Sequence, residues 1–124
     1  MNAGLAVAQE LIDPNALDLI RSLQPEAGDE LLAQLIGIYL EDAPKHIVAM
    51  RAATQHSDVD ALRVAAHTLK SSSAQLGALR LSESCRTLEQ RARSKQVDDA
   101  ALLVSDVERE FAQVRAAFEQ LRAA

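Results

Sequence analysis

The sequence predicts an all-α protein, an antiparallel four-helix bundle with an additional short N-terminal helix. Apolar residues recur at spacings of three and four along most of the chain, which is the period of helices that bury one face. No useful length of chain alternates apolar and polar residues with the period of two that a strand requires. Prolines, glycines and short polar turns separate the periodic segments, and helices joined by short turns pack as antiparallel neighbours.

The N-terminal half of the chain carries two predicted helices. Asp13 followed by Pro14 is typical of a helix N-cap and first position, so a short helix begins there and ends near Leu23. A longer helix begins after Gly28, where Leu and Ile recur at helical spacing. Pro44 interrupts this pattern before it resumes, so we expect a kink or a short break at that residue.

The C-terminal half carries three more predicted helices. The first extends from about Asp58 to Leu76, and Gly77 is a natural terminator. The next covers about residues 79–95, with an apolar stripe that repeats every three or four residues. The last follows the polar turn at residues 96–99. These spans complete the four long helices of the predicted bundle.

Length, charge and cysteine content limit the class of protein. A chain of 124 residues forms one domain, which we assign to residues 13–124, leaving residues 1–12 as an extension: a disordered start, a linker or an added helix. The net charge of −5 argues against a nucleic-acid binder, and no segment reaches the length of apolar chain that a membrane span needs. The single cysteine, Cys85, cannot form an intramolecular disulfide, so we expect a cytoplasmic location.

His67 lies on a predicted helix with one strongly apolar side. At about 3.6 residues per turn, five mostly apolar residues share the inner side of this helix. They are Leu62, Ala66, Leu69, Ser73 and Leu76. His67 falls on a flank, together with Lys70 and the small Ser71, so we expect its ring to reach solvent.

Lys70 is the helical neighbour of His67, because side chains three residues apart lie almost above one another. A neutral imidazole is a nucleophile near neutral pH, and an ammonium group beside it offsets the charge of an incoming phosphoryl group. The pair therefore suits phosphoryl transfer. Helix geometry alone is also compatible with an ordinary surface histidine beside an ordinary surface lysine.

Residues 65–93, AAHTLKSSSAQLGALRLSESCRTLEQRAR, closely resemble the signature of histidine phosphotransfer (HPt) domains. The matching parts are an alanine before the histidine, H-x-L-K, a run of small residues, L-G-A, and L-x-x-x-C-x-x-L-E-x-x-x-R. Residues 39–44, YLEDAP, also resemble the second helix of the family. The match is specific, because many spaced positions coincide across two helices and the turn between them.

The resemblance implies a role for each site residue. His67 would be the phosphoacceptor, and Lys70 would stabilise the phosphoryl group. Glu89 would accept a hydrogen bond from the ring nitrogen that is not phosphorylated, which would fix the tautomer, and Arg93 would lie at the rim. Ser71 departs from the family pattern, which commonly has Gly directly after the lysine; serine is still small, and its hydroxyl is a further candidate donor to the phosphoryl group.

The remaining candidate residues indicate no second site. His46 and His56 lie near predicted helix ends without metal-ligand spacing, and we interpret both as surface histidines. Cys85 lies on an apolar stripe, which predicts a buried, inert thiol. The four glycines are scattered and form no phosphate-binding loop, so we expect a phosphoryl carrier without ATP-dependent kinase activity.

The leading hypothesis for function follows from the resemblance. His67 would attack the aspartyl phosphate of a response-regulator receiver domain and hand the phosphoryl group on to a second receiver in a two-component phosphorelay. The implied partners are receiver domains and a hybrid sensor histidine kinase, and Mg²⁺ would come from the receiver, since we expect no cofactor on this chain. We further expect a monomer that binds neither nucleic acid nor membrane.

Two alternatives stay open at this point. The same helical face could bind a receiver or kinase and inhibit it without being phosphorylated, although an intact His67 and Lys70 weigh against this. The chain could also be a purely structural helical bundle, in which case changing His67 would have no effect on phosphoryl transfer.

Overall fold

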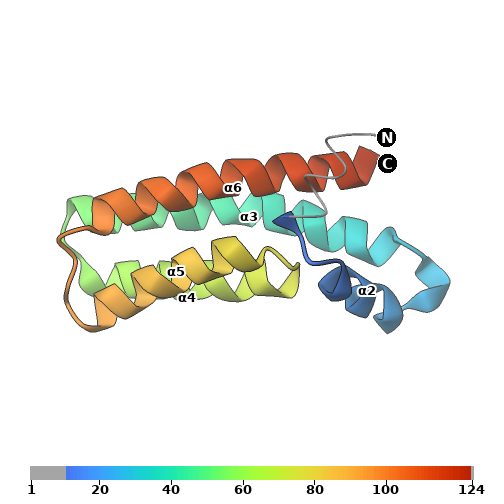
Figure 1. Ribbon diagram of the computed structural model, residues 1–124, viewed down its shortest axis with the longest axis horizontal. Coiled ribbons are helices and arrows are strands. Elements are labelled where there is room, and N and C mark those ends of the chain that lie inside the picture. The colour runs from blue at the N-terminus through green and yellow to red at the C-terminus, as the bar shows by residue number, and fades with distance from the viewer. Residues whose placement is uncertain (1–10, 124) are drawn as a thin grey trace.

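The computed structural model describes residues 11–123, and this part of the chain is helical without strands. Its elements are α2 (Pro14–Leu23), the short 3-10 helix η1 (Pro25–Ala27), α3 (Glu30–Gln55), α4 (Val59–Gln75), α5 (Leu79–Arg93) and α6 (Ala100–Ala123). Helices α3, α4, α5 and α6 form the four-helix bundle, and α2 packs against α3 (Figure 1). The predicted fold class, including the extra short helix, is confirmed.

The bundle has two layers, with α3 and α6 in one and the α4–α5 hairpin in the other (Figure 1). Helices α3 and α6 extend beyond the hairpin, and α2 lies beside that extension. One continuous core joins all five α-helices. Within it, Tyr39 meets Phe111 and Phe118 edge-on, and the Tyr39 hydroxyl pairs with the Ser73 hydroxyl at 2.8 Å, which links α3 to α4.

The turn between α4 and α5 also holds the start of α2. Gly77 has a φ of +81°, and its carbonyl oxygen accepts a hydrogen bond from the Asp13 amide at 2.9 Å. A Cβ atom at residue 77 would lie 2.8 Å from the Asp13 carbonyl oxygen, so only glycine permits both this turn and this close approach. Asp13 then caps α2 by accepting from the Asn15 amide at 3.0 Å, as predicted.

Of the kink or short break expected at Pro44, the break is not found, because α3 continues through this residue from Glu30 to Gln55. Proline has no N–H, so the carbonyl oxygen of Leu40, four residues earlier, loses its helical donor. Arg115 of α6 supplies a replacement, since its Nη2 atom donates to the Leu40 carbonyl oxygen at 3.1 Å. The neighbouring helix therefore satisfies the group that proline leaves unpaired.

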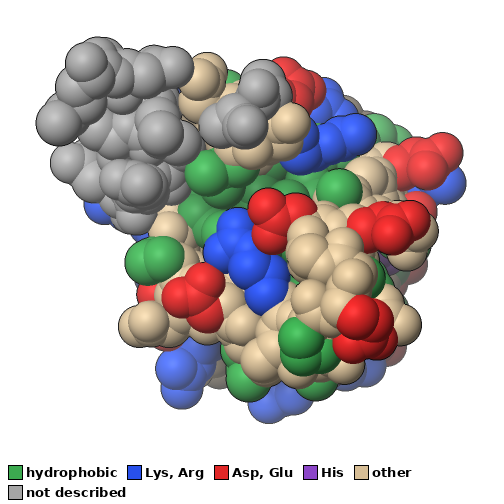
Figure 2. Space-filling view, turned by 90° about the vertical axis from the view of Figure 1, so that its right-hand side faces the viewer, with side chains coloured by type: hydrophobic (Ala, Val, Ile, Leu, Met, Phe, Trp, Pro, Cys, Tyr) green, Lys and Arg blue, Asp and Glu red, His purple; other side chains and the backbone are tan. Residues whose placement is uncertain are grey.

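The end of the bundle at which α2, α3 and α6 meet is hollowed (Figure 2). Hydrophobic side chains line the hollow, and charged side chains surround them. Arg21 of α2 bonds to Asp29 at 2.7 Å across its rim. The predicted extension, residues 1–12, lies outside the described residues except for Leu11 and Ile12, and Ile12 is buried in the core.

No helix within residues 11–123 has both the length and the apolar content to cross a membrane.

Candidate functional site

Helix α4 places His67 at the surface of the hairpin. Asp58 caps the helix by accepting from the Ala61 amide at 3.0 Å, which fixes where its first turn begins. The side chains predicted to face inward are buried: Leu62, Ala66, Leu69, Ser73 and Leu76. His67 lies on the flank of this face, with its side chain 55% exposed, as the helical spacing predicts.

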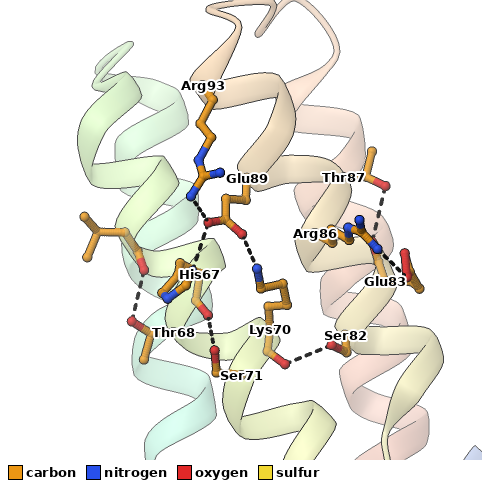
Figure 3. A network of polar contacts seen from close by, with 11 residues as sticks. His67, Thr68, Lys70, Ser71, Ser82, Glu83, Arg86, Thr87, Glu89 and Arg93 are labelled. Atoms are coloured by element: carbon orange, nitrogen blue, oxygen red, sulfur yellow. Dashed lines mark hydrogen bonds and ion pairs between the residues drawn. The ribbon is translucent and has the colours of Figure 1, made fainter.

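Helix α5 brings Glu89 opposite His67. Its predicted apolar stripe is buried, which fixes the rotation of the helix: Leu81, Cys85, Leu88 and Ala92. Ser82 adds a link between the helices, because its hydroxyl donates to the Lys70 carbonyl oxygen at 2.9 Å (Figure 3). Glu89 follows directly after the buried Leu88, and its side chain is only 3% exposed.

Three donors converge on the Glu89 carboxylate (Figure 3). His67 Nδ1 lies 2.9 Å from Oε2, and Lys70 Nζ lies 2.6 Å from Oε1. Arg93, one turn further along α5, places Nη2 at 2.9 Å from Oε2. The structure thus brings together four of the residues singled out in the sequence.

The charge of Glu89 fixes the tautomer of His67. Burial raises the pKa of a carboxyl group, but hydrogen bonds from Lys70 and His67 and the charges of Lys70 and Arg93 outweigh it and lower the pKa of Glu89. Glu89 is therefore ionised at neutral pH and acts only as an acceptor. Nδ1 of His67 must carry the proton, so in the neutral ring the lone pair is on Nε2.

Nε2 of His67 is the reactive atom that this arrangement offers. It makes no hydrogen bond with residues 11–123, and the half-exposed ring is open to a large reactant. Lys70 and Arg93 stand on either side of the carboxylate, with side chains 28% and 62% exposed, so both cations are accessible from solvent. A nucleophilic nitrogen beside two cations is suited to accepting an anionic group.

Comparisons with known proteins agree with this geometry. The family model of the Hpt domain matches residues 34–124. The chain belongs to the Hpt domain family. As a member, it is a histidine phosphotransfer protein of a two-component phosphorelay, a carrier of phosphoryl groups that works with response-regulator receivers and kinases.

Two solved structures of Hpt proteins resemble more than nine-tenths of the chain. One is histidine-containing phosphotransfer protein B (HptB) of Pseudomonas aeruginosa PAO1, with 31% sequence identity and a TM-score of 0.83, covering 91% of this chain and 95% of that one. The other is the maize histidine-containing phosphotransfer protein ZmHP2, with 25% identity and a TM-score of 0.81, covering 98% of both chains. Among curated protein sequences the comparison finds no significant match.

Ser71 of this Hpt protein is exposed beside His67, but its hydroxyl is engaged by the helix. Ser71 Oγ donates to the His67 carbonyl oxygen one turn back, at 3.2 Å. Serine hydroxyls in helices commonly bond to the carbonyl four residues earlier. To donate to a group on His67, the Ser71 side chain must change its rotamer.

The other candidate residues of the Hpt protein lie away from this network. His56 is exposed at the C-terminal end of α3, as predicted. The prediction for His46 is wrong, because α3 does not end near this residue: His46 lies inside the helix and is half-buried. Cys85 is fully buried; burial and then the charge of Glu110 raise the pKa of its thiol to about 12, so it is inert near neutral pH. Residues 11–123 hold no cluster of three or more His, Cys, Asp or Glu side chains suited to a metal ion.

Sequence reasoning missed a groove on the Hpt protein, which we call the apolar groove. It lies between α2, α3 and α4, and Thr68 and Ser72 of α4 line it next to His67. Leu19, Leu23 and Ile38 also line it and are exposed by 67%, 69% and 55%. The signal was present in α2, where Leu19 and Leu23 form a second apolar stripe beside the buried Leu17 and Ile20.

Proposed function

We propose that His67 is the residue that accepts the phosphoryl group, and that the chain relays it between the aspartates of receiver domains. One observation carries this proposal. His67 exposes Nε2 to solvent while Nδ1 is held at 2.9 Å from an ionised, buried Glu89. A ring fixed at one nitrogen and open at the other is oriented for attack on a phosphorus atom.

The transfer step balances on the groups present. The lone pair of His67 Nε2 attacks the phosphorus of a receiver's aspartyl phosphate, the N–P bond forms, and the bond between phosphorus and the aspartate oxygen breaks. The aspartate leaves as a carboxylate, and the ring becomes a phosphorylated imidazolium. Because Nδ1 keeps its proton against Glu89, no proton has to leave His67 during the step. A second receiver's aspartate reverses the reaction.

Lys70 and Arg93 balance the charge during transfer. Lys70 donates to Glu89 in the unphosphorylated site and lies on the same flank of α4 as His67. A phosphoryl group on Nε2 gives Lys70 a second anionic partner within reach of a flexible side chain. Arg93 keeps its bond to Glu89 Oε2 and so holds the carboxylate in place if Lys70 turns toward the phosphoryl group.

The receiver supplies the remaining groups. In this proposal Mg²⁺ belongs to the receiver's own site, and the Hpt protein acts as a monomer without ATP-dependent kinase activity, membrane attachment or nucleic-acid binding. A hybrid sensor kinase is the proposed source of the phosphoryl group.

The apolar groove adjoins His67 through Thr68, and this position next to the reacting ring supports it as the surface that docks the receiver. The lone, buried Cys85 supports a reducing compartment such as the cytoplasm.

The experiment that tests the proposal is incubation with a phosphorylated receiver and Mg²⁺. The wild-type chain should acquire acid-labile, alkali-stable phosphate, and His67→Gln should acquire none. His56→Gln is the matched control, because His56 is also exposed but lies outside the network, and it should behave as wild type. Phosphate on His67→Gln would exclude His67 as the acceptor, and binding of the receiver without any transfer would favour the inhibitor alternative.

A further inference from the structure

Charge is distributed unevenly along this acidic chain. Residues 58–95, which form α4, α5 and their flanking turns, contain seven Lys or Arg and four Asp or Glu, a net charge of +3. The rest of the chain contains six basic and fourteen acidic residues, a net charge of −8. The hairpin that carries His67 is therefore the cationic part of a protein whose overall charge is −5.

Three of these cations line one cleft, which we call the basic cleft. It lies between the start of α4 and the end of α5, and Arg63, Arg93 and Lys95 contribute to its walls. Arg93 bonds to Glu89, whereas neither Arg63 nor Lys95 forms an ion pair with a carboxylate of the described residues. The charges of Arg63 and Lys95 are thus available to a partner.

The carboxylates of the cleft leave it a net positive charge. Asp58 and Asp60 also line it, so the lining carries three cations and two carboxylates. Arg93 is paired with Glu89, which is not part of the lining, and residues 58–95 around the cleft keep a net charge of +3. The Asp58 carboxylate accepts from the Ala61 amide at the N-terminus of α4, where its negative charge faces the positive end of the helix dipole. Lys95 lies in the turn after α5, where it is exposed.

The basic cleft is continuous with the reacting ring. Arg63 precedes His67 by four residues, one turn of α4, and Arg93 shares the Oε2 atom of Glu89 with His67. Along α4 the basic cleft occupies the turns before His67, and the apolar groove occupies the turns after it. A protein that docks over the ring therefore lies next to both surfaces.

We propose that the basic cleft docks an acidic segment of the receiver and selects receivers by charge, an inference that rests on the proposed function. Opposite charges across an interface accelerate the encounter and exclude partners of like charge. A local acidic segment fits better than a nucleic acid, because the net charge of −8 on the rest of the chain repels an extended polyanion. The basic cleft would repel a receiver that presents a basic surface to it.

The test is charge reversal in the cleft. Arg63→Glu/Lys95→Glu changes two residues that lie outside the Glu89 network, and Lys95→Glu alone changes an exposed turn residue if the double variant folds poorly. Arg109→Glu is the control for the single variant, because Arg109 is 64% exposed on α6 and the change in net charge is equal. Arg109→Glu/Arg122→Glu serves the same purpose for the double variant.

The readout is kcat/KM for transfer from a phosphorylated receiver as a function of salt. The double cleft variant should lower kcat/KM about tenfold at low ionic strength, because steering by charge changes association rates on at least this scale. At about 0.5 M salt the loss should shrink to roughly twofold, since screening is then effective within a few ångströms. The α6 variants should change kcat/KM less than about twofold at both salt concentrations.

A small donor separates failure of this inference from failure of the proposed function. Phosphoramidate needs no docking surface, so it should phosphorylate His67 in wild type and cleft variants alike. If the receiver phosphorylates wild type but cleft and α6 variants respond equally, charge selection is overturned and the relay stands. If wild type accepts phosphate from neither donor, the relay itself fails. If RNA competes with the receiver through Arg63 and Lys95, the cleft belongs to nucleic acid and the inference is overturned.

Discussion

Glu89 is the only charged residue that is buried within residues 11–123. A buried carboxylate is costly unless it is paired and hydrogen-bonded, and Glu89 has a partner for both oxygens: Lys70 on Oε1, and His67 with Arg93 on Oε2. All three donors are more exposed than the acceptor. Solvent therefore reaches the His67 ring, whereas the Glu89 carboxylate that orients the ring is shielded from solvent.

We predict that Glu89→Gln lowers stability in a pH-dependent way. At about pH 7 the free energy of unfolding should fall by about 1–3 kcal/mol, because the amide cannot accept from all three donors. The folded-state pKa of Glu89 lies below its ordinary value of 4.5, so its contribution is fully present above that value. The contribution is lost as the pH falls through the lower folded-state pKa.

Urea unfolding of both proteins at several pH values measures this effect. The difference between wild type and Glu89→Gln should be greatest near neutral pH. It should narrow as the pH falls below the ordinary value of 4.5 toward the lower folded-state pKa of Glu89. Asp106→Asn, which changes a carboxylate of an exposed ion pair on α6, serves as the control and should change stability little at any pH. If Glu89→Gln lowered the free energy of unfolding by the same amount at every pH, Glu89 would not be the ionised group described here.

At this scale the sequence predicted which of these side chains lie together, because helical spacing decides which side chains share a flank. His67 and Lys70 are three apart on α4, and Glu89 and Arg93 are four apart on α5. The burial of Glu89 was not predictable, since it depends on how deeply α5 sits against α4. Arg63 was missed as well, because its relation to Arg93 arises only when the two helices pack.

Helix α3 shows how one element depends on another. Its interior proline removes the donor to the Leu40 carbonyl oxygen, and a guanidinium group of α6 replaces that donor at 3.1 Å. Arg115 also lies over the Phe111 ring, 5.1 Å from its centroid, which holds the guanidinium in position. The helix stays continuous because α6 satisfies the group that Pro44 leaves unpaired.

A double-mutant cycle between Pro44 and Arg115 tests this dependence. Arg115→Met should destabilise the protein by about 1–2 kcal/mol, because the Leu40 carbonyl oxygen loses its donor. Pro44→Ala supplies a helical N–H to that oxygen, so Arg115→Met should cost less in its presence. Chemical unfolding of the four proteins should give a coupling of about 0.5–1.5 kcal/mol.

The contact with Phe111 cancels in this cycle, since Arg115→Met removes it in both backgrounds. Additive losses would show that Arg115 acts only through that contact. Of the kink or short break expected at Pro44, the break is absent for the same physical reason. Local rules treat a proline as a missing donor, whereas the replacement donor to Leu40 comes from Arg115, 75 positions along the chain from Leu40. The helix starts and ends were predictable from local signals, such as the Asp58 cap and Gly77.

The whole molecule presents different surfaces on the two sides of His67. The antiparallel order and the inward faces could be predicted, because each helix has one apolar stripe and short turns leave few ways to bury it. The apolar groove could not, since it requires α2 to lie beside the end of α3 that extends past the hairpin (Figure 1). Without the position of α2, the sequence does not show that Leu19 and Leu23 line a groove instead of packing into the core.

The apolar groove should matter for transfer and not for stability. Leu23→Ser changes a side chain that is 69% exposed, so the free energy of unfolding should change by no more than about 0.5 kcal/mol. If the groove docks the receiver, kcat/KM for transfer should fall roughly tenfold, which corresponds to about 1.4 kcal/mol of lost binding. Leu102→Ser is the matched control, because Leu102 is 67% exposed on α6 and lies outside the groove. Transfer assays at subsaturating receiver, paired with urea unfolding, would reject this docking surface if the two serine variants lost activity equally or if Leu23→Ser lost none.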